Sequence, residues 1–156
     1  MALVECAKGK PPLTFPGCVS NFALKLSESK QLINYQMNAE NINGTQSRTD
    51  DFRADMSITT GSASLADYKY SGYDRGHLCP AADMTQNKTA MSESFFLSNK
   101  SPQTAGFNRE IWSVAESQVR KWVLEYGKLY VVTGPIFKNN IGFFKRSLLK
   151  TNNYLP

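Results

Sequence analysis

The sequence is poor in the side chains that hold transition metals. It contains one histidine, His77, and three cysteines, none of which form a Cys-x-x-Cys pair. A structural zinc site takes four nitrogen or sulfur ligands at short spacings, so this composition argues against one. Cys6 and Cys18 could pair in an exported protein, which would leave Cys79 as the odd thiol. The cysteines therefore favour a secreted or periplasmic location without deciding the compartment.

Long apolar runs are also missing. No run approaches the roughly 20 residues that cross a bilayer, and Met1–Glu5 have neither the basic nor the apolar part of a signal peptide. We therefore expect no membrane partner. Hydrophobic residues still make up 41% of the 156 residues, which is enough for one folded domain with a core.

Acidic residues are fewer than basic ones. Thirteen Asp and Glu stand against 18 Lys and Arg, which gives a formal net charge of +5 at pH 7. A basic protein attracts polyanions, and nucleic acid is the first candidate among them. The charge balance therefore indicates a class of partner, whereas the type of reaction has to be inferred from the motifs.

The chain is organised as a lead-in and one domain. We expect residues 1–18 to form an extended lead-in and residues 19–156 to form a single domain. Apolar residues recur at helical spacing over residues 108–126, with Asn108 in the N-cap position and Gly127 as the stop. Strand patterns lie on both sides of a polar stretch and cover residues 19–26, 31–37, 95–97 and 129–133. This order predicts an α+β fold with a mixed, mainly antiparallel sheet.

The single histidine lies in the tetrapeptide Asp74–His77, with the sequence DRGH. Histidine is the side chain whose ordinary pKa lies nearest to neutrality, so His77 is the first candidate for proton transfer at pH 7. Phosphodiester hydrolysis needs such a base, cations for the phosphoryl charge and help for the leaving oxygen. The candidate cations are Arg48, Arg75, Arg109 and Arg120. The candidate oxygen ligands for a hard divalent ion are Asn108, Glu116, Asn99, Asp74 and Asp83.

The segments around this tetrapeptide resemble the DNA/RNA non-specific endonuclease family, whose site is the His-Me finger or ββα-metal motif. The resemblance covers roughly residues 19–137. It is carried, in chain order, by Arg48–Asp55, Ser71–Met84, Met91–Gln103, Gly106–Trp112 with Glu116 and Arg120, and Val131–Pro135. It implies an α+β fold in which two strands and a helix form a finger around one Mg²⁺, with Mn²⁺ as the alternative ion.

The resemblance also implies roles for individual residues. His77 would be the general base, and Asn108 would be the direct protein ligand of the metal. Glu116 would position metal-bound water, and Arg48 would stabilise the pentacoordinate phosphorane. The residues expected to support the site or to contact phosphate are Arg75, Asn99, Arg120 and Asp74, the last by fixing the loop through hydrogen bonds.

The function that the resemblance implies is Mg²⁺-dependent cleavage of phosphodiester bonds in DNA and RNA, which leaves 5′-phosphate ends. Little sequence preference is expected, because contacts to phosphate carry no direct sequence information. One alternative is an inactive nucleic-acid-binding domain that keeps the fold but has lost activity with the missing C-terminal part. A separate alternative is that His77 has only a structural role. Another is a phosphodiesterase for small nucleotides, which would need a closed pocket instead of an open basic groove.

Other interpretations also apply to single residues. Asn is among the best N-caps, so Asn108 could cap its helix instead of binding a metal. Glu116 and Arg120 lie four residues apart and could form an exposed ion pair on one helix face. Arg53 could take the role that the resemblance gives to Arg48.

The C-terminal part departs from the family. Family members continue past the strand that ends at Gly134–Pro135 with further strands and a closing helix, whereas this chain ends at Pro156. We therefore expect an abbreviated C-terminal part with an uncovered sheet edge, which favours association. A homodimer is one form that this association could take.

Overall fold

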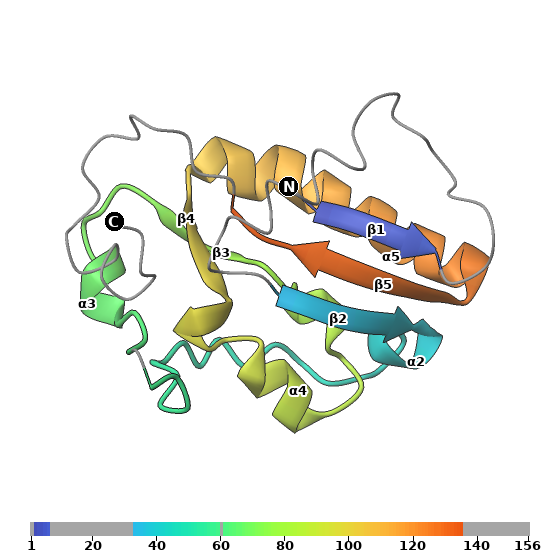
Figure 1. The fold of residues 1–156 in the computed structure, drawn as a ribbon, viewed down its shortest axis with the longest axis horizontal. Coiled ribbons are helices and arrows are strands. Elements are labelled where there is room, and N and C mark those ends of the chain that lie inside the picture. The colour runs from blue at the N-terminus through green and yellow to red at the C-terminus, as the bar shows by residue number, and fades with distance from the viewer. Residues whose placement is uncertain (1, 7–32, 60, 136–156) are drawn as a thin grey trace.

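The computed structural model describes residues 2–6, 33–59 and 61–135, and two antiparallel sheets organise them (Figure 1). The strands are β1 (Ala2–Cys6), β2 (Ile33–Asn38), β3 (Asp74–His77), β4 (Lys100–Gln103) and β5 (Lys128–Thr133). The α-helices are α2 (Ala39–Ile42), α3 (Leu65–Tyr68), α4 (Lys88–Glu93) and α5 (Ser113–Tyr126). Shorter helical turns are η1 (Ala81–Asp83), η2 (Leu97–Asn99) and the π-helical turn η3 (Phe107–Trp112).

The larger sheet has the order β1-β5-β2, with β5 in the centre and antiparallel to both neighbours. Helix α5 lies across one face of this sheet (Figure 1). Apolar residues of the two layers form the main core, which contains Met37, Val119, Val123, Leu129 and Val131. Since α5 and β5 follow one another in the chain, their packing depends on a tight reversal between them.

Gly127 makes that reversal. Its φ of +80° lies in the left-handed region, which glycine adopts without a steric cost. Its backbone N–H donates to the carbonyl of Val123 at 2.8 Å and thereby closes the last turn of α5. The predicted helix stop at Gly127 is therefore confirmed.

The smaller sheet pairs β3 with β4, and His77 lies directly opposite Lys100. Gly76, one residue before, lies close to the side chain of Gln103: a Cβ at this position would lie 2.1 Å from Gln103 Cδ. A side chain at residue 76 would therefore displace the side chain of Gln103. The helical turn η3 and α5 follow β4 directly, so the chain forms a strand–strand–helix unit.

The loop before α3 is held between two small apolar clusters. Phe52 packs against Ala63, Tyr68 and Leu97 on one side and against a cluster that contains Phe95 on the other. Arg53 continues the attachment, because its backbone N–H donates to the carbonyl of Phe95 and its carbonyl accepts from the N–H of Leu97. This anchoring brings a segment far from β3 in sequence, residues 48–53, beside it.

Most of the predicted elements are confirmed, and two local predictions are wrong. The α+β class, the long helix, the strand at 129–133 and the strand at 31–37 all hold, the last as β2. Residues 95–97 do not form a strand: Phe95 ends the turn after α4, and Phe96 makes only an isolated bridge with Arg53. The strand at 19–26, the 1–18 boundary, the Cys6–Cys18 pair and the C-terminal part past residue 135 lie outside the described residues.

The N-cap prediction for Asn108 is the second that is wrong. Helical conformation already begins at Ala105, and Asn108 lies inside the first turns. Thr104 takes the capping role, because its Oγ1 accepts from the backbone N–H of Phe107 at 3.4 Å. The Asn108 side chain is therefore available for other contacts.

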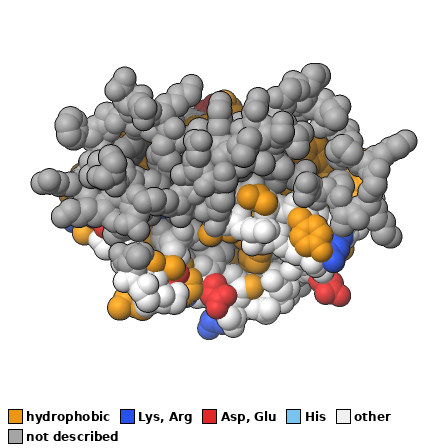
Figure 2. Space-filling model, in the orientation of Figure 1, with side chains coloured by type: hydrophobic (Ala, Val, Ile, Leu, Met, Phe, Trp, Pro, Cys, Tyr) orange, Lys and Arg blue, Asp and Glu red, His pale blue; other side chains and the backbone are white. Residues whose placement is uncertain are grey.

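The described surface shows no broad patch of one charge in the orientation of Figure 2. Single Lys, Arg, Asp and Glu side chains lie there among polar and hydrophobic ones (Figure 2). Among the described residues, no helix is long and apolar enough to cross a membrane.

Candidate active site

A cleft of about 620 Å³ opens beside β3. Its walls come from the loop before α3, from α3 and the segment after it, from β3 and from η3. Its lining residues are Arg48, Asp50, Phe52, Leu65, Tyr68, Lys69, Tyr73, Asp74, Arg75, His77, Asn108 and Arg109. Three of the residues predicted to act chemically, His77, Arg48 and Asn108, thus share one cleft.

Two hydrogen-bond systems hold the chain at His77. The indole N–H of Trp112 donates to the carbonyl of His77 at 3.1 Å, which ties the end of β3 to the helix. Asn99 is buried, and its side-chain oxygen accepts from the N–H of Cys79, while its Nδ2 donates to the carbonyls of Cys79 and Ser94. Asn99 is therefore a supporting residue, since all of its contacts are within the protein and none face the cleft.

The His77 ring lies in an aromatic and cationic environment. It meets Phe95 edge-on, with ring centroids 5.2 Å apart, and its centroid lies 6.1 Å from that of Phe52. Burial, together with the charges of Lys100 and Arg48, lowers the pKa of His77 to about 2. The imidazole is therefore neutral at physiological pH, and one of its ring nitrogens carries a lone pair.

His77 also carries a polar atom that lacks a partner. Its Nε2 is buried and makes no hydrogen bond within the part of the chain that the structure describes. A buried polar atom without a partner costs about 1–3 kcal/mol, so such atoms call for a water molecule or a ligand.

Asp74 organises the opposite side of the cleft. Its Oδ2 accepts from Asn108 Nδ2 at 2.9 Å, and Arg109 binds both of its carboxylate oxygens at 2.9 Å. The hydrogen bonds from Arg109 and Asn108 hold the pKa of Asp74 below its ordinary value. The prediction that Asp74 fixes the local geometry through hydrogen bonds agrees with these contacts.

The contact with Asp74 also orients the amide of Asn108. An ionised carboxylate only accepts hydrogen bonds, so the amide nitrogen must face Asp74 and the amide oxygen must point away from it. Among the described residues, no hydrogen bond occupies Asn108 Oδ1. Asn108 thus presents one free carbonyl-type oxygen at the cleft.

A hard divalent cation fits this donor set better than a transition metal. The described residues contain no group of three or more His, Cys, Asp and Glu side chains that could hold a metal. Mg²⁺ prefers oxygen, keeps several of its waters and accepts as few as one or two protein ligands. The free oxygen of Asn108 meets this requirement.

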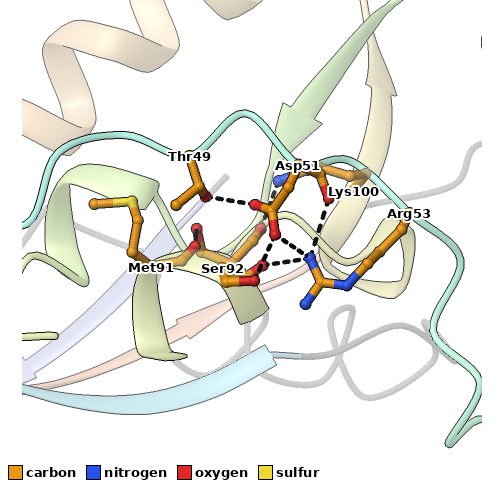
Figure 3. A network of polar contacts seen from close by, with 7 residues as sticks. Thr49, Asp51, Arg53, Met91, Ser92 and Lys100 are labelled. Carbon is orange, nitrogen blue, oxygen red and sulfur yellow. Dashed lines mark hydrogen bonds and ion pairs between the residues drawn. The ribbon is translucent and has the colours of Figure 1, made fainter. Parts of the chain in front are cut away.

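Arg48 and Arg53 have different surroundings. Arg48 lines the cleft, lies 4.7 Å from the centroid of the Phe95 ring and pairs with Asp50 at 2.6 Å. Arg53 Nη1 instead donates to Asp51 and to the carbonyl of Ser92, in the network shown in Figure 3. Its guanidinium lies 4.1 Å from the centroid of the Phe96 ring, away from the cleft lining. The geometry therefore favours Arg48 over Arg53 as the cation beside His77.

Arg75 is another cation of the cleft. Its guanidinium lies 4.0 Å from the centroid of the Phe52 ring, and the residue is exposed. Stacking on an aromatic ring holds a guanidinium in place while leaving its N–H donors for an anion. Arg75 is therefore placed to contact phosphate.

Glu116 and Arg120 do not line this cleft. Arg120 Nη1 donates to Asp83 at 2.8 Å, and the hydroxyl of Tyr35 donates to the other oxygen of Asp83 at 2.9 Å. Glu116 is half-buried beside them, and burial together with the charge of Asp83 raises its pKa to about 7. The interpretation of Glu116 and Arg120 as an exposed ion pair is thus wrong, because Arg120 pairs with the buried carboxylate of Asp83.

The Arg120–Asp83 pair predicts a stability effect. Asp83 is 1% exposed, so Arg120→Met would leave a buried carboxylate with only the Tyr35 hydroxyl. We expect the free energy of unfolding at about pH 8 to fall by about 3 kcal/mol, as for other broken buried pairs. The loss should be smaller at about pH 5, because a protonated Asp83 needs no counter-charge.

Urea denaturation of Arg120→Met at both pH values measures this effect. Ser117→Ala is the control, since it removes only the exposed hydroxyl that Arg120 Nη2 contacts at 3.1 Å. An equal loss at the two pH values would contradict a role for the charge of Asp83.

Several cleft residues were not anticipated from the sequence. Phe52 and Phe95 flank His77, and Tyr68, Lys69 and Tyr73 form a wall of the cleft. Lys100 is fully buried opposite His77. No signal in the sequence marks Lys100, because only the pairing register of β3 with β4 places that residue directly across from the histidine.

The geometry of the cleft agrees with the family that related sequences indicate. The family profile described as DNA/RNA non-specific endonuclease matches residues 17–154. Human "Endonuclease G, mitochondrial" is 39% identical over 104 residues, which cover 65% of this chain and 35% of that protein. A "Nuclease" from Nostoc sp. is 35% identical over 121 residues, covering 74% of this chain and 44% of its own length.

A further relative and a solved structure give the same result. "Nuclease 1, mitochondrial" of Schizosaccharomyces pombe is 47% identical over 76 residues, which are 48% of this chain and 24% of that protein. The crystal structure of an EndoG/EndoGI complex contains a chain with a TM-score of 0.64 and 32% identity, matched over 74% of this chain and 51% of that chain. The chain spans less than half of the length of each of these three curated relatives. Its sequence profile and its strand–strand–helix unit place the chain in the DNA/RNA non-specific endonuclease family.

Proposed function

We propose that this chain is a Mg²⁺-dependent nuclease that hydrolyses phosphodiester bonds of DNA and RNA with His77 as general base and leaves 5′-phosphate ends. The single observation that carries the proposal is the shared cleft. A neutral histidine, the three guanidinium groups of Arg48, Arg75 and Arg109, and the free oxygen of Asn108 lie around it. The printed names of the relatives, which are nucleases, support the same class of reaction.

The protein side chains divide the chemistry among them. His77 accepts a proton from the attacking water, which raises the nucleophilicity of the water oxygen. Arg48 and Arg75 hold the phosphate and offset the charge that develops on its oxygens. Asp74 and Arg109 keep the Asn108 amide in a single orientation. Asn108 would hold a hard divalent ion, which would supply Lewis-acid chemistry to the phosphate and to the leaving 3′ oxygen.

The substrate range follows from these contacts. The charged groups of the cleft can recognise phosphate, which DNA and RNA share, and phosphate contacts carry no base information. Cleavage without strong sequence preference is therefore part of the proposal. The homodimer and the secreted or periplasmic location stay predictions from the sequence.

The test is an incubation of the purified chain with plasmid DNA, with RNA and with dinucleotides, in Mg²⁺ and in excess EDTA. We expect nicking and then fragmentation of both polymers in Mg²⁺, no cleavage in EDTA, and ends that carry 5′-phosphate as judged by ligation. Cleavage that survives EDTA would contradict the metal requirement. Binding that weakens with salt but lacks cleavage would point to an inactive binding domain, and turnover of dinucleotides alone would point to a small-nucleotide phosphodiesterase.

A further inference from the structure

The turn between α3 and β3 holds a tyrosine in a conformation that favours glycine (Figure 1). The N–H of Ser71 donates to the carbonyl of Tyr68 at 3.1 Å, and Lys69 has φ −63° and ψ 124°. Tyr70 follows with φ +57°. These values are those of a type II turn, in which the third residue is normally glycine or asparagine. A bulky side chain in the left-handed region costs free energy, so some contact of Tyr70 must offset that cost.

Packing within the described part of the chain does not offset it. The Tyr70 side chain is 91% exposed, so it gains almost nothing from hydrophobic burial. Its ring centroid lies 5.1 Å from the amine of the exposed Lys69, and a cation–π contact in solvent is weak. Two residues later the same left-handed conformation, with φ +80°, is occupied by Gly72. The aromatic ring at residue 70 therefore points to a contact with another molecule.

The turn lies at the rim of the candidate active-site cleft. Lys69 and Tyr73, which precede and follow Tyr70 in the chain, both line the cleft. The guanidinium groups of Arg48 and Arg75 belong to the same lining. Tyr70 itself is outside the lining, and its ring lies beside the Lys69 amine. A polymer whose phosphates enter the cleft would therefore pass an exposed aromatic ring at this rim.

We propose that Tyr70 stacks on an unpaired base of a single-stranded nucleic acid whose phosphates occupy the cleft. This inference deepens the proposed nuclease function and rests on it for the identity of the polymer. In a duplex the bases are paired and stacked on one another, so a ring at the surface meets no free base face. Single-stranded DNA or RNA is therefore the preferred ligand of this rim.

The combination of charge and ring argues for this occupant. Four cationic side chains line the cleft, and its two carboxylates are already paired, Asp50 with Arg48 and Asp74 with Arg109. A cationic groove for the backbone with an aromatic ring for the bases is the combination by which proteins bind single strands. Stacking tolerates every base, because each base has a π-face, and this agrees with cleavage without strong sequence preference.

The test is equilibrium binding in excess EDTA, followed by fluorescence anisotropy of labelled oligonucleotides. The three probes have equal length and are a single-stranded DNA of mixed sequence, a single strand made of abasic nucleotides, and a duplex. We expect Tyr70→Gly to weaken binding of the single-stranded DNA by about 5- to 100-fold, which is the usual worth of one stacked base. Binding of the abasic strand and of the duplex should change by less than about twofold, since phosphate contacts remain.

Each other outcome overturns the proposal. Unchanged affinity of Tyr70→Gly for the single-stranded DNA would mean that the ring contacts no base. An equal loss on the abasic strand would mean that Tyr70 acts on the phosphates or on the cleft itself. An equal loss on the duplex would remove the preference for unpaired bases, and failure of the unaltered chain to bind any of the probes would remove the site.

Matched variants separate the ring from the fold. Tyr70→Phe keeps the ring and should keep the affinity, whereas Tyr70→Asn, which tolerates the left-handed conformation, should lose as much as Tyr70→Gly. Tyr130→Thr is the control, because Tyr130 is also an exposed tyrosine with a lysine amine 5.3 Å from its ring centroid, but it lies outside the cleft lining. An equal loss in Tyr130→Thr would overturn the proposal.

The dependence of binding on salt supplies a second readout. The ring carries no charge, so Tyr70→Gly should leave the slope of log K against log[salt] unchanged, whereas a disturbed cleft would lose phosphate contacts and flatten the slope. A flattened slope would therefore contradict a stacking role.

Failure of this proposal and failure of the proposed function give different results. A chain that binds the probes as expected but cleaves nothing in Mg²⁺ loses the nuclease function and keeps the stacking role of Tyr70. A chain that cleaves DNA and RNA while Tyr70→Gly binds the single strand normally keeps the nuclease function and loses the stacking role.

Discussion

Replacing His77 with alanine is expected to lower kcat for plasmid cleavage by about 10²- to 10⁴-fold, which is the range that a general base contributes. The cleft offers no obvious substitute, because His77 is the only histidine and the nearby Lys100 is buried and bonded to Ser94. Arg48, Arg75 and Asn108 remain in place, so binding of substrate should change much less than kcat. Initial rates of plasmid nicking in Mg²⁺, together with salt-dependent DNA binding, measure the two effects separately.

Matched variants show whether a loss of activity in His77→Ala comes from loss of the base or from loss of the fold. His77→Gln fills more of the space between Phe52 and Phe95 than alanine does, and it should be equally inactive. Lys128→Met should keep full activity, since this exposed residue of β5 lies outside the cleft lining. Added imidazole should restore part of the rate in His77→Ala, because a free base can occupy the vacated space. Activity of His77→Ala within a few-fold of the unaltered chain would remove His77 as the base.

The sequence was sufficient for the parts of the molecule that depend on local pattern. The helix over residues 108–126 follows from apolar spacing and from Gly127, and the strand at 129–133 follows from an apolar run closed by Gly134–Pro135. The N-cap could not be placed in the same way, because Thr104 and Asn108 are both suitable capping residues and only the chain path decides between them. Because Thr104 caps the helix, the side chain of Asn108 is available to donate a hydrogen bond to Asp74.

Contacts between distant segments were beyond the sequence pattern. Arg120 is four residues from Glu116, and helical spacing alone suggests that the two interact. The partner is Asp83 instead, because η1 brings a buried carboxylate to the helix and a buried charge gains more from a guanidinium than an exposed one does. The burial of Lys100 was equally hidden, since a lysine in a short polar strand normally faces solvent. Both cases depend on the register and packing of elements that are far apart in the chain.

Replacing Asn108 with alanine is expected to lower the affinity for Mg²⁺ or Mn²⁺ by about 10²-fold or more, because the change removes the unoccupied amide oxygen that the described part of the cleft offers to the metal. Asp74→Asn should lower the affinity by about 10- to 100-fold, since an amide at residue 74 no longer forces the Asn108 nitrogen to face it. Isothermal titration calorimetry with each metal ion measures the affinities, and Lys128→Met should leave them unchanged.

The double variant tests whether Asp74 acts through Asn108. Under this hypothesis the Asp74 carboxylate acts only by orienting the amide oxygen of Asn108. Once Asn108 is alanine, no amide remains to be oriented, and Asp74→Asn should have no further effect. The double variant should therefore bind metal as weakly as Asn108→Ala alone. Two independent contacts would give additive losses, and additivity would contradict the positioning role. Asn108→Asp sharpens the distinction: a carboxylate is the stronger ligand for a hard cation, but it cannot donate to Asp74 and repels it. We therefore expect Asn108→Asp to bind metal no more tightly than the unaltered chain, whereas tighter binding would show that the orientation set by Asp74 is dispensable.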